Sequence, residues 1–135
     1  MPDVIALSLI ADLSFSVQVE DAAHRLGFRV ATVSTPDKAI ATLRHGRASL
    51  FVMDVIAAGD SVGEVVRAAK AAPYPVAVLV FGPQADLGTH QAVLDAGADL
   101  VVSRSQFNRE LAPCMIACLD KHRESQARAG TGARI

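Results

Sequence analysis

Strand-like and helix-like segments alternate five times along this 135-residue chain, and this alternation restricts it to very few folds. Apolar runs without a polar face mark residues 4–10, 50–54 and 74–81 as strands covered on both sides, and residues 100–102 form a last, short strand. Residues 28–32 alternate between apolar and polar side chains, which is typical of a strand at the edge of a sheet. Because helical spacing separates these strands, we expect parallel neighbours joined by right-handed crossovers.

The helical segments are bounded by recognisable start and stop signals. Gly27 ends the first helix, and Thr35 followed by proline begins the second. Capping-type residues Ser61 and Asn108 predict the starts of the third and last helices. Pro113 lies inside the last apolar pattern, so that helix either kinks or begins there.

The sheet order follows from the burial expected for each strand. Buried first, third and fourth strands beside a more polar second strand predict an α/β, doubly wound, five-stranded parallel sheet in the order 2-1-3-4-5, flanked by five helices. Ligands of such sheets bind outside the carboxyl ends of the strands, where the strand order reverses. Asp54 closes the strand 50–54 at that point. Asp54 is therefore the first candidate for a functional residue.

Composition restricts the class of protein. The chain is 51% hydrophobic, which is enough for one domain with a substantial core, predicted over residues 1–122. Residues 123–135 are polar and small, and we expect a C-terminal tail with nothing to bury. A net charge of -1, no membrane-length apolar run and no secretory signal predict a cytoplasmic protein that binds neither nucleic acid nor membrane.

Familiar catalytic and ligand motifs are absent from the sequence. It contains no glycine-rich dinucleotide or phosphate loop, no zinc-protease motif and no nucleophile elbow, so no enzyme is predicted. Cys114 and Cys118 lie four residues apart on one helix face, which is typical of core residues in a reducing compartment. The histidines are predicted to be solvated on helix surfaces and ends; they are His24, His45, His90 and His122.

Five short features follow one another in a distinctive order. They are Leu26-Gly27-Phe28, the strand from Leu50 to Asp54, Pro75 with its apolar strand, Ala96-Gly97-Ala98-Asp99, and Phe107. Together they resemble the receiver domain of bacterial two-component response regulators, a flavodoxin-like fold, over about residues 3 to 120. The resemblance implies that Asp54 accepts a phosphoryl group from a histidine kinase. It also implies two magnesium-binding acids after the first strand, a hydroxyl ending the fourth strand and a lysine ending the fifth.

Most of these supporting residues are replaced. Counting back from Gly27 puts the acid pair on Ile10 and Ala11, whereas aligning the residues around the first loop with the family pattern puts it on Asp12 and Leu13. At most one carboxylate therefore remains.

The other supporting positions differ as well. The hydroxyl position falls on Val80, Phe81 or Gly82, none of which carries a hydroxyl. The lysine position falls on Arg104, which keeps the positive charge but carries it on a planar guanidinium group. The aromatic residue that reports activation in many receivers corresponds to Val101. We therefore take Asp12, Gly82 and Arg104 as the equivalents of active-site residues.

A weakened magnesium site would consist of Asp54, Asp12, a backbone carbonyl near Ile56 and water, since Mg²⁺ can bind through one or two carboxylates. Alternatively, Asp54 is a strand-end carboxylate without a chemical role, kept by exposure or by a pair with Arg104. For Asp12 the alternative is a loop or helix-start acid, and for Arg104 it is a charged loop residue beside an acid.

The resemblance leads to three functional hypotheses. The first is a stand-alone atypical receiver, or pseudo-receiver, that signals through protein contacts without conventional phospho-switching. Its partner would be a histidine kinase, a downstream regulator or a second copy in a homodimer, bound through a face that includes His90, Leu94, Val101 and Arg104. The second is a phosphorelay receiver phosphorylated on Asp54. The third is a flavodoxin-like module that binds a small ligand.

Overall fold

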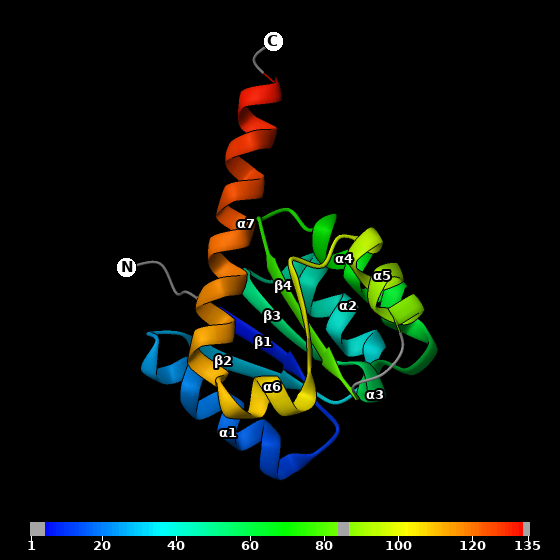
Figure 1. The fold of residues 1–135 in the computed structure, drawn as a ribbon, viewed down its shortest axis with the longest axis vertical. Helices are drawn as coiled ribbons and strands as arrows, with labels where there is room; N and C mark the ends of the chain where they lie inside the picture. Colours follow the sequence, from blue (N-terminus) through cyan, green and yellow to red (C-terminus); the bar gives the residue numbers. More distant parts are fainter. Residues whose placement is uncertain (1–4, 84–86, 134–135) are drawn as a thin grey trace.

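A five-stranded parallel sheet in the order β2-β1-β3-β4-β5 forms the centre of the molecule (Figure 1). The structure is a computed structural model that describes residues 5–83 and 87–133. The strands are β1 (Ile5–Leu9), β2 (Arg29–Val33), β3 (Ala48–Asp54), β4 (Ala77–Gly82) and β5 (Leu100–Ser103). All four ladders are parallel. The predicted α/β doubly wound sheet and its order are confirmed.

Helices cover both faces of the sheet (Figure 1). They are α1 (Leu13–Arg25), α2 (Pro36–His45), α3 (Val55–Ala58), α4 (Val62–Lys70), α5 (Leu87–Ala96), α6 (Arg104–Arg109) and α7 (Leu111–Ala133), with the 3-10 turn η1 (Gly59–Ser61). α2, α4 and α5 pack on one face, and α1, α6 and α7 pack on the other. The described residues thus contain two short helices, α3 and α6, beyond the five that were predicted.

Strand burial follows the apolar pattern of the sequence. The residues from Leu50 to Asp54 in β3 are all buried, as is the whole of β4. β2 lies at the sheet edge, and none of its residues is fully buried. Phe51 and Phe81, both 0% exposed, point to opposite faces of the sheet, and burying such a side chain contributes about 1.5–3 kcal/mol.

The last predicted helix divides into two. α6 ends at Arg109, Glu110 leaves the helical conformation, and α7 begins at Leu111 with Pro113 in its first turn. Proline is tolerated there because the first-turn N–H groups have no partner within the helix. Of the two alternatives for Pro113, the structure shows a helix that begins there. Asn108 lies inside α6 and does not cap the last helix.

At two further helix starts, the alternative of Asp12 as a helix-start acid is confirmed, whereas the predicted Ser61 cap is wrong. The N-cap of α1 is Asp12, whose carboxylate accepts the Phe15 N–H. Ser61 precedes α4, but its side chain makes no capping hydrogen bond. Thr35 caps α2 as predicted and accepts the Lys38 N–H. Local spacing therefore located the helices better than it identified their caps.

α7 continues well past the point where the sequence suggested a tail. It runs to Ala133 rather than ending near Lys121, and Figure 1 shows its final turns extending beyond the sheet. Residues 123–128 are exposed. Lys, Arg, Glu, Gln and Ala favour helix, and extending an existing helix avoids the cost of nucleation. The domain boundary at residue 122 stays a prediction. Even at this length, no helix among the described residues is apolar enough to cross a membrane.

Cys114 and Cys118 face the core from α7 and are both buried free thiols, as predicted. Burial raises the pKa of the Cys118 thiol to about 12. This thiol is therefore protonated at neutral pH and serves as a small core residue.

Candidate functional site

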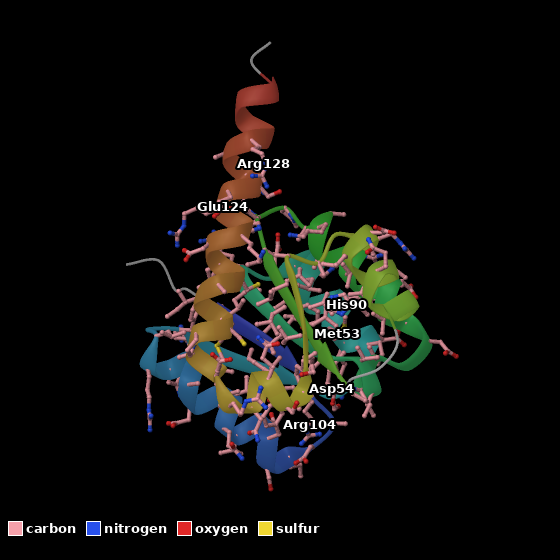
Figure 2. All side chains as sticks on the ribbon, in the orientation of Figure 1. Met53, Asp54, His90, Arg104, Glu124 and Arg128 are labelled. Carbon is pink, nitrogen blue, oxygen red and sulfur yellow. The ribbon has the colours of Figure 1, made fainter. Side chains whose placement is uncertain are left out.

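Asp54 lies at the carboxyl end of β3, beside the loop after β1, and Figure 2 shows it in the same part of the molecule as Arg104, which directly follows β5. It is 2% exposed. Its Oδ1 atom accepts the Ile56 N–H at 2.9 Å, and its Oδ2 atom accepts the Ala11 N–H at 3.2 Å. Asp54 therefore joins the loop after β1 to α3, which it caps. The alternative explanation that Asp54 is kept by exposure is wrong.

Arg104 pairs with a different carboxylate. Its Nη2 atom donates to Asp12 Oδ2 at 2.8 Å. The hydrogen bond from Arg104, followed by the one from the Phe15 N–H, holds the pKa of the Asp12 carboxyl below its ordinary value. Asp12 is thus a carboxylate paired with a cation of its own chain. The suggested pair between Arg104 and Asp54 is replaced by this one, and Arg104 is the first residue of α6, not a loop residue.

The guanidinium group of Arg104 lies over an aromatic cluster formed by Phe15, Phe81 and Phe107. The carbon atom at the centre of the Arg104 guanidinium lies 4.7 Å from the centroid of the Phe15 ring. Phe15 makes edge contacts with Phe81 and Phe107, at centroid distances of 5.2 and 5.8 Å, and the rings of Phe81 and Phe107 are 5.0 Å apart. A cation over an aromatic face is attracted by the ring quadrupole. The cluster therefore orients Arg104 toward Asp12.

Nothing in the sequence indicated this cluster as a functional feature. Its phenylalanines come from α1, β4 and α6. Beyond the apolar patterns, Phe107 contributed only to the resemblance, and Phe81 was only one candidate for the hydroxyl position. No spacing signal connects them, because the sheet brings them together from distant parts of the chain.

Gly82 is the last residue of β4 and pairs with Ser103 of β5. A Cβ atom at Gly82 would lie 3.0 Å from Val55 Cγ2 and 3.1 Å from Val55 Cβ. The Val55 side chain therefore occupies the space that a larger residue at position 82 would need. The nearby hydroxyl of Ser103 caps α6 by accepting the Gln106 N–H.

We expect Gly82→Ser to destabilise the protein by about 1–3 kcal/mol, because overpacking against Val55 forces a shift. The combined variant Val55→Ala/Gly82→Ser should recover part of that loss. Urea unfolding of the wild type, both single variants and the double variant measures the coupling. Additive effects of the two substitutions would show that the two side chains do not compete for space.

Both carboxylates of the predicted magnesium site already have partners within the chain. Mg²⁺ needs oxygen ligands in near-octahedral geometry. Each carboxylate oxygen of Asp12 and Asp54 already accepts a hydrogen bond, and Ile56 contributes its N–H to Asp54. Over residues 5–83 and 87–133, no group of three or more His, Cys, Asp or Glu side chains could hold a metal ion.

The predicted partner-face residues lie on two sides of β5. His90 is exposed on α5, and Figure 2 shows it well apart from Arg104. Leu94 and Val101 are half-buried, and Val101 packs against the core. The Arg104 side chain points toward Asp12. Asp12, Asp54, Gly82 and Arg104 are thus brought together at one edge of the sheet, whereas His90 and Leu94 lie on α5 and Val101 packs against the core.

The prediction of four solvated histidines is correct for three of them. His24, His45 and His90 are exposed. The His122 side chain is only 13% exposed and lies near Asp99. Its burial depends on how α7 crosses the end of β4, which helical spacing does not reveal.

Comparison with solved structures identifies the fold. A response regulator receiver domain protein from Methanospirillum hungatei JF-1 matches with a TM-score of 0.77 and 18% identity, covering 92% of this chain and 99% of the other. The chain has the receiver fold. The receiver fold also appears in a Burkholderia pseudomallei response regulator with a phosphorylated aspartic acid and a calcium ion (TM-score 0.74, 18% identity, 96% and 75% covered).

A third match is the receiver domain of a Pseudomonas aeruginosa PAO1 sensor histidine kinase with magnesium in its active-site cleft (TM-score 0.66, 18% identity, 84% and 98% covered). Neither the protein-family models nor the curated proteins contain a match to this chain. At these identities the likeness shows the receiver fold alone, so the role of the site rests on the residues described above.

Proposed function

We propose that this chain is an atypical receiver, a pseudo-receiver that takes part in signal transduction through protein contacts and without conventional phospho-switching. The observation that carries the proposal is the ion pair between Asp12 and Arg104. Transfer of a phosphoryl group to a carboxylate requires cations that offset the gathering negative charge. Here the cation beside Asp12, the one carboxylate left of the expected acid pair, is Arg104 of the same chain.

The site also lacks the groups that would transmit phosphorylation to the surface. Gly82 has no side chain, and Val55 fills the adjacent space. Val101 replaces the aromatic residue implied by the resemblance and packs against the core. A phosphoryl group on Asp54 would therefore meet no hydroxyl from position 82 and no aromatic side chain at position 101.

A receiver of this kind would act through its surface. The surface that we assign is the α5–β5 side, with exposed His90 and half-buried Leu94 and Val101. Its partner would be a protein: a histidine kinase, a downstream regulator or a second copy of the chain. Arg104 contributes to the site at the sheet edge rather than to this surface.

Phosphorylation of Asp54 is the second candidate function, favoured by the position of Asp54 at the carboxyl end of β3. The Burkholderia pseudomallei protein of the same fold carries a phosphorylated aspartic acid. In this chain, however, Asp54 is buried and both of its oxygens accept backbone N–H groups. These contacts would have to rearrange before a phosphodonor could reach the carboxylate.

A magnesium titration followed by NMR tests the role of Arg104. We expect no saturable shift of the amides around Asp12 and Asp54 in the wild type. Arg104→Ala removes the competing cation and should tighten Mg²⁺ binding by about tenfold or more. Arg25→Ala is the matched control, since it removes an arginine that pairs with Asp21 on the exposed side of α1. Equal Mg²⁺ binding by the wild type and Arg104→Ala would contradict the proposal.

Treatment with a small phosphodonor and Mg²⁺ distinguishes the two candidate functions. The pseudo-receiver should yield no acid-labile adduct. An adduct that forms in the wild type and is absent from Asp54→Ala would instead establish the phosphorylated receiver.

A further inference from the structure

A second polar cluster lies at the amino end of the sheet, opposite the edge that carries Asp54. Asp99, in the turn before β5, accepts hydrogen bonds at Oδ2 from Lys70 Nζ at 2.6 Å and from the Val78 N–H at 2.8 Å. Lys70 Nζ also donates to the Val76 carbonyl at 3.0 Å. One carboxylate oxygen thus connects α4 with β4 and with the turn before β5.

His122 of α7 approaches the same oxygen without forming a hydrogen bond. Its Nδ1 atom lies 3.6 Å from Asp99 Oδ2, which is too far for a hydrogen bond. Nδ1 is buried and has no hydrogen-bond partner among the described residues. A buried polar atom without a partner costs free energy, so the position of His122 beside Asp99 is not stabilised by a hydrogen bond.

The charges around His122 oppose its protonation. Lys70 faces it from α4 and Asp99 from the turn before β5, Cys118 lies one helical turn away on α7, and β4 contributes the uncharged backbone of Val76 and Val78. Burial, followed by the positive charge of Lys70, lowers the pKa of His122, while Asp99 acts in the opposite direction. A single carboxylate would have to serve two cations if His122 were charged.

His122 also marks the place where α7 leaves the domain. It is half-buried, whereas residues 123–128 are exposed. Figure 2 shows Glu124 and Arg128 on the part of the helix that extends beyond the sheet. An isolated helix of this length is marginal in water, so this extension depends on the anchoring of the preceding turns.

We propose that Lys70, Asp99 and His122 form a proton-sensitive latch that holds α7 against the amino ends of β4 and β5 while His122 is neutral. Protonation places an imidazolium beside the Lys70 ammonium and loosens α7 from about Cys118 onward. Because the docked state lowers the pKa of His122 from its ordinary value of 6.5, the latch is at full strength above that pH. It weakens as the pH falls through that value toward the lower pKa of the docked state.

Hydrogen exchange of α7 tests the latch. We compare the exchange of peptides from α7 in the wild type, His122→Gln and His24→Gln at about pH 7.5 and about pH 5.5, on either side of the ordinary histidine pKa. Comparison at the same pH cancels intrinsic exchange rates. The wild type and His24→Gln, whose histidine is exposed on α1, should lose protection at the lower pH relative to His122→Gln, by up to about tenfold. An equal loss in all three proteins would overturn the proposal.

Lys70→Met gives a sharper test because it should reverse the direction in which the protection of α7 changes with pH. Without the ammonium, a protonated His122 can pair with Asp99, so α7 should become better protected at the lower pH. A direct NMR titration of the wild-type histidine rings needs no variant to fold. If His122 titrates at or above the ordinary histidine pKa of 6.5, no latch of this kind exists.

Discussion

Phe107→Ala is expected to destabilise the protein by about 3–5 kcal/mol, the usual cost of removing a fully buried phenylalanine. Phe107 is 0% exposed and packs against both Phe15 and Phe81. Its removal opens a cavity between α6 and the sheet and withdraws an edge contact from the ring that supports Arg104. Urea denaturation gives the change in the free energy of unfolding.

Phe107→Leu is the control, because it keeps most of the apolar volume and removes only the aromatic contacts. We expect it to cost substantially less than the alanine variant. If both variants unfold at the wild-type urea concentration, the aromatic cluster does not hold α6 to the domain.

Asp99→Ala is expected to destabilise the protein by about 2–4 kcal/mol. It leaves the Val78 N–H and the Lys70 ammonium without their shared acceptor. The cost should stay below that of a fully buried pair because the Lys70 side chain is 26% exposed and can reach water. Thermal unfolding at neutral pH, where His122 is neutral, separates this effect from the latch.

Asp99→Asn keeps an acceptor for the Val78 N–H but removes the charge, so we expect an intermediate loss. Asp21→Ala provides the comparison on the surface, because Asp21 pairs with Arg25 in an exposed ion pair. Exposed pairs contribute about 0–1 kcal/mol. An Asp99→Ala variant as stable as Asp21→Ala would show that the buried cluster contributes nothing.

Much of the fold could be predicted from local patterns. The buried runs of β1, β3 and β4 and the alternating β2 were sufficient to place β2 at the edge. Helix ends were harder to predict. Ser61 looked like a cap but makes no capping bond, whereas Asp12, which was considered a helix-start acid only as an alternative, caps α1, because a capping bond depends on how the chain enters the helix. The continuation of α7 to Ala133 was missed because polar composition alone does not distinguish an exposed helix from a tail.

The members of the candidate site were predictable, but their interactions were not. The parallel sheet required Asp54, Gly82 and Arg104 to meet at its carboxyl edge, and the structure places them there. The sequence did not indicate which carboxylate pairs with Arg104. The Arg104 guanidinium lies over the ring of Phe15, which follows Asp12 by three residues in the sequence. This position favours a pair with Asp12 over one with the buried Asp54.

Apolar periodicity alone is enough to specify the architecture, because it shows which faces are buried, and burial on both faces forces a parallel sheet with helices on each side. The roles of the charged residues depend instead on how the chain packs in three dimensions. Arg104 and Asp12 are 92 residues apart, and Lys70, Asp99 and His122 come from three separate segments. The partner of a charge depends on distance, burial and competing donors in three dimensions, and none of these is encoded in local spacing.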